Sequence, residues 1–357
     1  MLVAESPLER SHARGRRQPG LVGIALALRP RWRWDADMST MLIYGAAGFV
    51  GTALGSQLTR YQADRVILVD QRPVPDPVCR RLEENGISVI VRHASALRDL
   101  DLPRDIKEVV VLAGQTDVDE ALADPYQAFE QNIQIAVEVG EWLRNCPQAK
   151  LFYLSSDEVL GESSVPLAEN AMYRPTQPYA ASKAAAEMVL HCYRDTYSLN
   201  VVTVRACNLL GGHQRARKLI PAAVTHLVRG LEVPVCGSGR QAREWLAVED
   251  LSSALFTLIE CELSAGVYHC SSGVSLTVLQ VIQLVARALN TPPRFRYIPD
   301  RLVQDRYYAM SCSRLRSLGW SPQWEVGDAI DRAAKAMSSA LMAGESLLGA
   351  GAPVGGG

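Results

Sequence analysis

The sequence predicts an α/β protein with a doubly wound parallel sheet and a smaller C-terminal region over the ligand-binding edge of that sheet. From Met41 onward, short apolar runs alternate with amphipathic helical patterns, which is typical of right-handed βαβ units and a sheet covered on both faces. After about residue 206 the alternation loosens into prolines, glycines and shorter elements. We expect this later region to lie at the carboxyl ends of the strands, where open α/β folds bind ligands.

The individual elements follow from the same patterns. Apolar runs predict strands at 41–45, 65–70, 87–91, 108–114, 150–154 and 200–208. Apolar residues at helical spacing predict helices at 49–61, 125–143 and 179–193. Neither an internal repeat nor a heptad run is evident in the sequence.

Composition restricts the class of protein. The chain has 357 residues, of which 48% are hydrophobic, so it can bury a sizeable core. Its 37 Lys and Arg residues nearly balance 38 Asp and Glu residues, which argues against general attraction to nucleic acid or to a membrane surface. Eight scattered cysteines without a CxxC pair predict neither a metal site nor a disulfide scaffold and favour the reducing cytoplasm.

A glycine-rich turn follows the first predicted strand. Gly45, Gly48 and Gly51 have GxxGxxG spacing and open the first helix, where backbone N–H groups can bind a pyrophosphate. Asp70 ends the next strand, 19 residues after Gly51, where its carboxylate can accept hydrogen bonds from a ribose diol and would repel a 2′-phosphate. Together they indicate a Rossmann-type site for NAD rather than NADP, although Arg72 could soften that preference and Asp70 alone could be an ordinary strand-end residue.

The cofactor motif and the order of the predicted elements suggest how the chain is divided. Residues 41–205 are expected to form the NAD-binding Rossmann domain, and residues 206–342 mainly the substrate-binding region, interleaved with the first. Residues 1–40 are interpreted as a flexible leader or an over-extended start, since their apolar run is shorter than the ~20 residues of a spanning helix. The glycine-rich residues 343–357 are expected to be a disordered tail.

A Tyr/Lys pair lies on the second long helix. Tyr179 and Lys183 are four residues apart, so their side chains project from one face. An ammonium near a phenol favours the phenolate, which suits a general base that takes a hydroxyl proton. With Ser156 at a strand end, these residues are the parts of a hydride-transfer site.

Two acidic residues, Asp157 and Glu158, follow the buried strand at 150–154. Two carboxyl groups in different environments can serve as the acid and the base of one reaction. Adjacent strand residues point to opposite faces, so both can reach one substrate only if the chain leaves the sheet at Ser156, a bend that Gly161 permits. The alternative is a capping or solvated pair at a strand exit.

These motifs resemble those of the extended short-chain dehydrogenase/reductase superfamily and, within it, of the dTDP-glucose 4,6-dehydratase family. The similar stretches include "GAAGFVG", "SSDEVLG", "PYAASKAAAE", "KLIP" and "GSGRQAREWLAVEDLSSAL". The resemblance implies a nucleotide-sugar 4,6-dehydratase with tightly bound, recycled NAD. Tyr179 would take the C4 hydroxyl proton as NAD accepts the C4 hydride, Glu158 would remove the C5 proton, and Asp157 would protonate the departing C6 hydroxyl. The hydride would return to C6.

The resemblance also implies further binding residues and an oligomeric state. Phe49, Val50 and Ala113 would join Tyr179, Lys183 and the glycine turn in cofactor binding. The expected substrate-binding residues are Thr116, Asn208, Lys218, Leu219 and Arg243, and the guanidinium of Arg243 suits phosphate oxygens. A homodimer through the helices around 125–145 and 179–197 is what the family resemblance implies.

Several positions depart from the family pattern. Asp117 and Gln304 stand where histidines are common, Leu160 where a tyrosine is common, and Ser95 where an adenine-contacting aspartate is expected. The hydride machinery is intact and the sugar pocket is atypical. An NDP-sugar 4-epimerase, a 5,6-dehydratase and a catalytically silent NAD-binding protein therefore stay open as alternatives. The basic cluster at 213–218 is either a phosphate funnel or a solvated loop.

Overall fold

The computed structural model of the chain describes residues 39–61, 63–214, 216–261 and 265–344. The leader expected at residues 1–40 and the tail expected at 343–357 fall almost wholly outside the described residues.

The main sheet has seven parallel strands in the order β10-β6-β5-β4-β1-β2-β3. The order reverses between β1 and β4, the topological switch point at which open α/β sheets bind ligands. The predicted doubly wound parallel sheet is therefore confirmed. The strands are β1 (Thr40–Tyr44), β2 (Arg65–Asp70), β3 (Ser88–His93), β4 (Ile106–Val111), β5 (Lys150–Ser156), β6 (Asn200–Ala206) and β10 (Gly266–Cys270).

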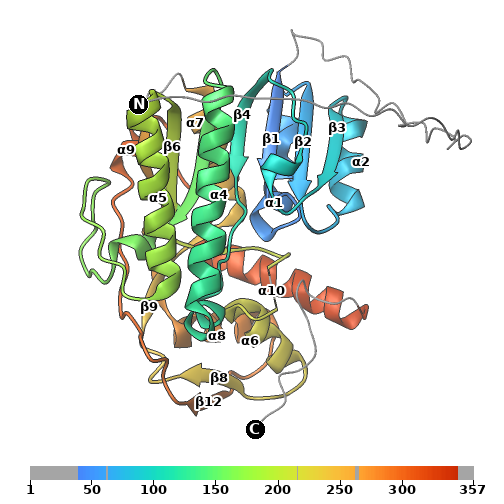
Figure 1. Cartoon of the computed structure of the whole chain (residues 1–357). Helices are drawn as coiled ribbons and strands as arrows, with labels where there is room; N and C mark the ends of the chain where they lie inside the picture. The colour runs from blue at the N-terminus through green and yellow to red at the C-terminus, as the bar shows by residue number, and fades with distance from the viewer. Residues whose placement is uncertain (1–38, 62, 215, 262–264, 345–357) are drawn as a thin grey trace, which may run out of the picture. The chain divides into compact units, whose positions relative to one another are not determined.

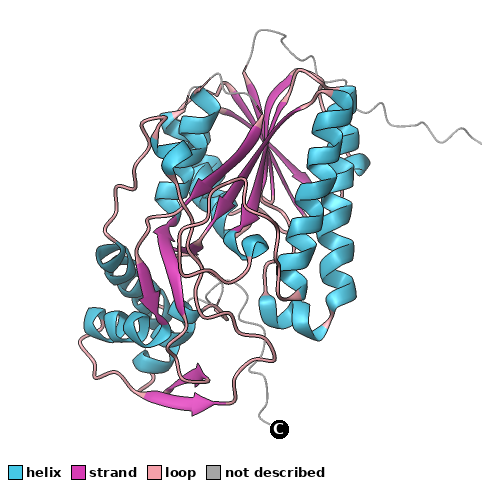
Figure 2. Cartoon of the chain, turned by 90° about the vertical axis from the view of Figure 1, so that its left-hand side faces the viewer, coloured by secondary structure: helices cyan, strands magenta, loops and turns pink. Residues whose placement is uncertain are grey.

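Helices cover both faces of this sheet, as Figure 2 shows. Alternate residues of β1 serve the two faces: Leu42 and Tyr44 pack on the side of α4 and α5, whereas Met41 and Ile43 pack on the opposite side. The long helices α4 (Pro125–Asn145) and α5 (Pro178–Tyr197) run side by side in Figure 1. The other face carries α1 (Phe49–Gln57), α2 (Asp76–Glu84) and α7 (Val248–Glu260).

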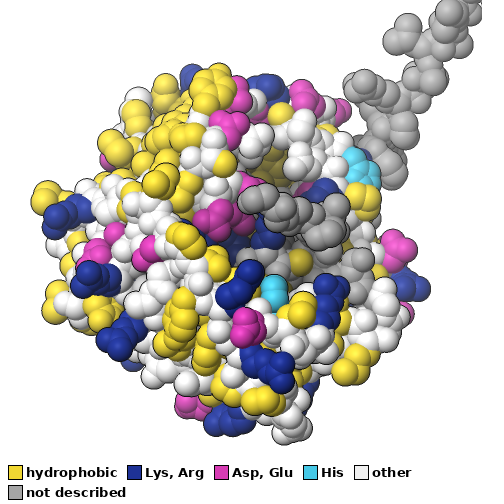
Figure 3. All heavy atoms as spheres, turned by 90° about the horizontal axis from the view of Figure 1, so that it is seen from below, with side chains coloured by type: hydrophobic (Ala, Val, Ile, Leu, Met, Phe, Trp, Pro, Cys, Tyr) yellow, Lys and Arg dark blue, Asp and Glu magenta, His cyan; other side chains and the backbone are white. Residues whose placement is uncertain are grey.

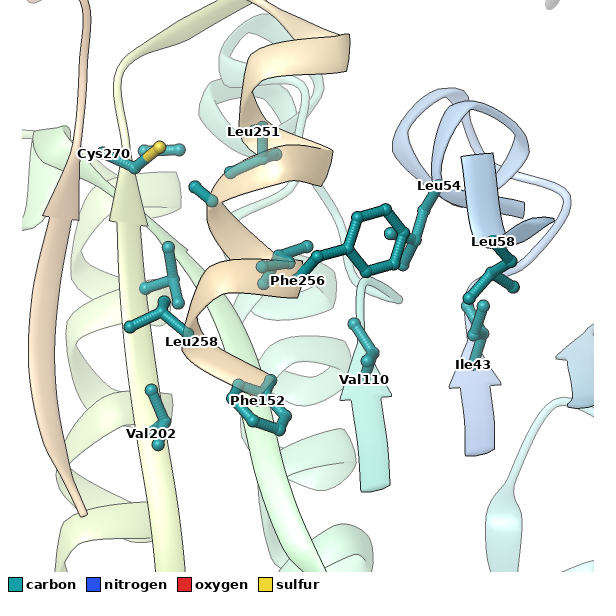
Figure 4. Close-up of a cluster of buried hydrophobic side chains, with 14 of the residues drawn as sticks. Ile43, Leu54, Leu58, Val110, Phe152, Val202, Leu251, Phe256, Leu258 and Cys270 are labelled. Carbon is teal, nitrogen blue, oxygen red and sulfur yellow. The ribbon is translucent and has the colours of Figure 1, made fainter. Parts of the chain in front are cut away.

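Hydrophobic side chains from α1 and α7 meet on that second face. Figure 4 shows Phe256 of α7 directed towards Leu54 of α1, whereas Leu251 of the same helix lies on the side of Cys270. The Phe256 ring also stacks on Tyr61, with ring centroids 5.8 Å apart. Helix α7 comes from beyond residue 206, so the core of the first half of the chain is completed by the second half.

The later part of the chain adds a smaller region with its own core. It holds a three-stranded sheet in the order β11-β9-β7 and a parallel pair of β8 and β12. Three helices, α6, α8 and α10, share one apolar cluster with these strands and lie beyond the lower ends of the main strands in Figure 1. The elements are β7 (Asn208–Leu210), α6 (Leu219–Val228), β8 (Val233–Cys236), β9 (Ala242–Ala247), β11 (Ser275–Thr277), α8 (Val278–Ala288), β12 (Phe295–Ile298) and α10 (Val326–Met342).

Short turns complete the described chain. The short helical segments are η1 (Leu58–Arg60), η2 (Leu97–Asp99), α3 (Val118–Ala123), η3 (Asp157–Leu160) and α9 (Ser313–Arg316). Within the described ranges, every helix is too short or too polar to cross a membrane.

Candidate active site

A cavity of about 910 Å³ opens at the carboxyl ends of the main strands and is closed on its other side by the smaller region. Figure 3 shows the molecule from below, and acidic and basic side chains gather near the middle of the face seen in that view. Every site residue proposed from the sequence lines the cavity. They are Gly45, Gly48, Phe49, Val50, Gly51, Asp70, Ala113, Thr116, Ser156, Asp157, Glu158, Tyr179, Lys183, Asn208, Lys218, Leu219 and Arg243.

The glycine turn between β1 and α1 is packed against its neighbours. A Cβ at Gly45 would lie 2.5 Å from the nitrogen of Ala113, and one at Gly51 would lie 2.3 Å from the Gly45 oxygen. Gly45 also has a φ of 97°, a conformation that side chains rarely adopt. Gly48 precedes α1 and no side chain caps that helix, so its first N–H groups face the cavity as an anion site. The turn fits a dinucleotide pyrophosphate.

Asp70 at the end of β2 is buried and holds this turn. Its Oδ2 accepts the Ala47 N–H at 2.9 Å, and its Oδ1 accepts the Arg72 N–H at 2.9 Å. A carboxylate has about four acceptor positions, so two remain for a ribose diol. The Arg72 side chain lies beside the same carboxylate, with Nε 3.5 Å from Oδ1, which leaves the guanidinium paired with Asp70.

The chain leaves the main sheet directly after Ser156. Strand β5 ends there, and η3 begins at Asp157, so the two carboxyls escape the alternation of a strand and both reach the cavity. The Ser156 hydroxyl accepts the Glu158 N–H at 3.3 Å and donates to Asp157 Oδ1 at 3.1 Å. Gly161 ends the turn with a φ of 71°, where a Cβ would lie 2.2 Å from the Arg174 oxygen.

The two carboxyls have different surroundings. Burial, followed by the nearby Glu158 charge, raises the pKa of Asp157 to about 8. Burial also raises the pKa of Glu158, but Arg243 and a hydrogen bond from Gln177 act in the opposite direction. At neutral pH Asp157 is therefore a protonated acid, whereas Glu158 has partners that favour its charged form.

Lys183 and Tyr179 lie in the same cavity but differ from the expected arrangement. The Lys183 ammonium donates to the Tyr153 hydroxyl at 2.8 Å and to the Leu154 carbonyl at 2.7 Å, both on β5. Burial lowers the pKa of Lys183 to about 7. The pKa of Tyr179 is raised by burial and by Glu158, against a hydrogen bond with Ser156. The phenol is thus surrounded by acids, and these contacts oppose the lowered pKa expected from Lys183.

A buried ion pair lies one helical turn beyond Lys183. Arg205 of β6 binds Glu187 of α5 through Nη2 at 2.8 Å and Nε at 3.0 Å, and both side chains are almost fully buried. The Tyr173 hydroxyl donates to the same carboxylate at 2.9 Å, and the Ser155 hydroxyl donates to its other oxygen. The partners satisfy a charge that would otherwise be costly to bury.

The smaller region supplies basic side chains to the cavity. The Lys218 ammonium donates to the Thr116 carbonyl at 2.9 Å, and Arg301 pairs with Asp119 at 2.7 Å. Arg243 of β9 lies over the Tyr308 ring, 4.4 Å from its centroid. Of the basic cluster at 213–218, position 215 lies outside the described residues.

Comparison with known proteins fits this geometry. The pattern of the NAD dependent epimerase/dehydratase family matches residues 41–270, more than half of the chain. The chain belongs to this family. Its cofactor is therefore NAD, for which the glycine turn and Asp70 are suited.

Individual relatives have low sequence identity to this chain, but the alignments cover nearly their whole length. A dTDP-glucose 4,6-dehydratase of Haemophilus influenzae is 28% identical over 319 residues, covering 80% of this chain and 94% of the relative. A low-salt glycan biosynthesis protein of Haloferax volcanii is 27% identical over 299 residues, covering 82% and 96%. The crystal structure of a dTDP-glucose 4,6-dehydratase from Streptomyces venezuelae with NAD bound superposes with a TM-score of 0.79 at 27% identity, covering 84% of this chain and 97% of that one.

The positions that depart from the family pattern have identifiable local roles. Asp117 caps α3, because its Oδ1 accepts the N–H groups of Asp119 and Glu120 at 3.0 and 3.2 Å. Leu160 is buried in the main core. Gln304 lines the cavity, and the Ser95 carbonyl accepts the Tyr44 hydroxyl at 2.8 Å.

Sequence reasoning missed three polar residues that line the cavity. Gln177 bonds Glu158, while Tyr308 bonds Asp305 and lies beneath Arg243. The stretch used to predict Tyr179 and Lys183, "PYAASKAAAE", begins one residue after Gln177. Gln177 precedes a proline at the start of a helix, which marks it as a helix cap, but glutamine is not a preferred cap residue.

Proposed function

We propose that the chain is an NAD-dependent nucleotide-sugar 4,6-dehydratase, a lyase acting by C4 oxidation, loss of water between C5 and C6, and hydride return to C6. The observation that carries this proposal is the convergence of Asp157, Glu158 and Tyr179 on one cavity at the carboxyl ends of β4 and β5. The similarity to dTDP-glucose 4,6-dehydratases supports it.

The first step needs a base for the C4 hydroxyl. When bound, NAD would supply a hydride acceptor for C4 and, once reduced, a hydride donor for C6. Tyr179 lies beside Ser156 and takes the hydroxyl proton in its phenolate form, while Lys183, fixed to β5, holds positive charge next to the reacting groups. Because the pKa of Lys183 is lowered to about 7, its ammonium can also release a proton near neutral pH.

The elimination gives the two carboxyls different roles. A ketone at C4 acidifies the hydrogen at C5, and Glu158 takes that proton as a base. Asp157 gives its proton to the C6 hydroxyl, which leaves as water, so the atoms balance and the sugar gains a C5–C6 double bond. The raised pKa of Asp157, about 8, supports this assignment, because the group is protonated at neutral pH.

The remaining site residues suit a nucleotide diphosphate. Arg243 and Lys218 place two cations on the wall formed by the smaller region, and Asn208, Leu219 and Thr116 lie around them. A guanidinium forks onto phosphate oxygens, and the lysine adds a point charge. We therefore assign the diphosphate and the sugar to this side of the cavity.

Isotope labelling tests the proposal. Purified protein is incubated with a panel of dTDP, UDP, GDP and CDP hexoses, and mass spectrometry measures loss of one water. Substrate deuterated at C4 should give product with deuterium at C6 and solvent hydrogen at C5. Deuterium retained at C4 in a dehydrated product would indicate a 5,6-dehydratase, and unchanged product mass with inversion at C4 an epimerase. No reaction with any member of the panel would favour a silent NAD-binding protein.

The role of Tyr179 has its own test. Tyr179→Phe removes one hydroxyl and retains the ring, so NAD should stay bound while formation of the ketosugar is lost. Tyr193→Phe, at a half-buried tyrosine of the same helix whose hydroxyl bonds Glu141, is the matched control and should turn over normally. Unaltered turnover in Tyr179→Phe would contradict the assigned role.

We further propose a homodimer formed through α4 and α5. Tyr126, Met188 and Tyr197 on these helices are 74%, 59% and 46% exposed, so they would supply aromatic and apolar contacts to such an interface. Sedimentation at several concentrations should give twice the monomer mass, and Met188→Glu should shift it towards the monomer. A monomer at all concentrations would contradict the proposal.

The eight cysteines are free thiols in the structure, which supports the proposal of a reducing, cytoplasmic location. Cell fractionation tests this directly, and recovery of the protein outside the cytoplasm would contradict it.

A further inference from the structure

One amide side chain joins the two reacting parts of the site. Gln177 lies immediately before α5 and is 6% exposed. Its Oε1 accepts the N–H of Tyr179 at 2.7 Å, and its Nε2 donates to Glu158 Oε2 at 2.6 Å. The start of the helix that carries the phenol is therefore tied to the carboxylate on the turn after β5.

The chemistry of an amide suits both contacts. Pro178 at the first helical position has no N–H, so the Tyr179 N–H is the first donor of α5 that needs an acceptor. Ser, Thr, Asn and Asp satisfy such donors more commonly, but their shorter side chains lack the reach of glutamine. A Glu in this place would cap the helix and leave Glu158 without a donor. Glutamine supplies an acceptor and a donor at the required length.

We propose that Gln177 is a positioning residue that holds Glu158 for removal of the C5 proton. By binding Oε2 it fixes the rotamer of Glu158 and leaves Oε1 to meet the sugar. The inference rests on the proposed function, because it needs Glu158 to act as the base of the elimination. The hydrogen bond also favours the charged carboxylate, and its contribution lowers the pKa of Glu158 against the rise from burial.

Other charged groups also face Glu158 and affect the pKa of its carboxyl. Arg243 and Lys218 lower its pKa, and Asp305 raises it. The titratable and charged groups around it come from five parts of the chain: Asp157 on η3, Tyr179 on α5, Lys218 before α6, Arg243 on β9, and Arg301, Asp305 and Tyr308 after β12. None of these groups is altered by a substitution at Gln177. A change in the pH profile therefore reports on the lost hydrogen bond in Gln177→Ser, and on that loss together with the added charge in Gln177→Glu.

Two variants separate the two contacts. Gln177→Ser retains a helix cap and loses the reach to Glu158. Gln177→Glu retains the length and the cap and replaces the donor by a negative charge. The free energy that a hydrogen bond to a charged group contributes is large enough that its loss should lower kcat about ten- to a hundredfold in either variant. We expect KM to be nearly unchanged. The acidic limb of the kcat profile should move to higher pH, and further in Gln177→Glu.

Partial reactions identify the step. With substrate deuterated at C5, both variants should retain C4 oxidation, seen as a transient absorbance of reduced nicotinamide, and should lose the C5 label slowly. Equal loss of C4 oxidation and C5 exchange would overturn the inference, because Gln177 would then serve only α5 and Tyr179. Unchanged kcat and pH profile would overturn it as well. If Gln177→Ser does not fold, as judged by its melting temperature, Gln177→Glu carries the same readouts.

The same measurements on the unsubstituted protein separate this inference from the proposed function. If that protein removes no water from any nucleotide hexose, the proposed function fails and the inference fails with it. If it dehydrates its substrate and the variants behave like it, only the inference fails.

Discussion

Replacement of Asp157 by Asn should make the protein more stable while it removes dehydration. Asp157 is 3% exposed, and its pKa rises from 3.8 to about 8 on folding. A group whose pKa is raised in the folded state adds its full stability below the unfolded value and loses it as the pH rises towards the folded value. At neutral pH the folded protein must keep a proton that the unfolded chain releases.

The size of the effect follows from the same values. Each pH unit between the two pKa values lowers the free energy of unfolding by ~1.4 kcal/mol. About three pH units separate the unfolded value of 3.8 from neutrality, so the total loss at neutral pH is about 4 kcal/mol. Asn has nearly the shape of the protonated acid and can still accept the Ser156 hydroxyl at the Oδ1 position. Asp157→Asn should therefore gain up to about 4 kcal/mol at neutral pH, with no gain near the unfolded pKa.

Denaturant titrations of both proteins at a series of pH values measure this difference. Asp101→Asn, at an exposed aspartate of a loop, is the matched control for the change from Asp to Asn itself. If Asp157→Asn were less stable at every pH, or if its gain did not grow with pH, the protonated, buried state of Asp157 would be refuted.

Three further predictions concern the same regions. Gly51→Ala should lower both the retention of NAD after gel filtration and the melting temperature, and Gly48→Ala should lower them less. The reason is that the added Cβ would lie 2.3 Å from the Gly45 oxygen in Gly51→Ala and 3.1 Å from it in Gly48→Ala. Equal effects of the two substitutions would contradict this. Arg205→Met should lower the free energy of unfolding by about 3–5 kcal/mol because the buried Glu187 loses its cation, and adding Glu187→Leu should restore much of that loss in denaturant titrations. Dehydration rates should fall as the pH rises through about 8, where Asp157 loses its proton, and a flat rate profile across that range would contradict the acid role.

The fold and the membership of the cavity could be predicted from local sequence. The apolar runs at 41–45 and 65–70 became β1 and β2, and the glycine turn between β1 and α1 needs only close backbone approach. The loosened pattern after residue 206 predicted no individual helices there, although α7, α8 and α10 form in that part of the chain. Their stability comes from packing on distant elements, which local periodicity does not report.

The contacts inside the site were harder to predict than its residues. Lys183 was expected beside the phenol of Tyr179, but its bonds go to Tyr153 and to a carbonyl of β5, a strand nearly 30 residues earlier. Gln177 escaped notice because its importance depends on where η3 places Glu158. Both contacts arise from the way separate elements dock, and single-sequence patterns carry little information about docking.

The seventh strand of the main sheet limits how this chain can be divided or recombined. Strand β10 pairs with β6 from Gly266↔Val202 to Cys270↔Ala206, and α7 buries its apolar face on the sheet that earlier residues build. A fragment that stopped at residue 205 would expose an unpaired sheet edge and the apolar surface under α7. Exchange of the smaller region between relatives, to alter which sugar is accepted, must therefore leave β10 and α7 with the host and transplant only the segments on either side.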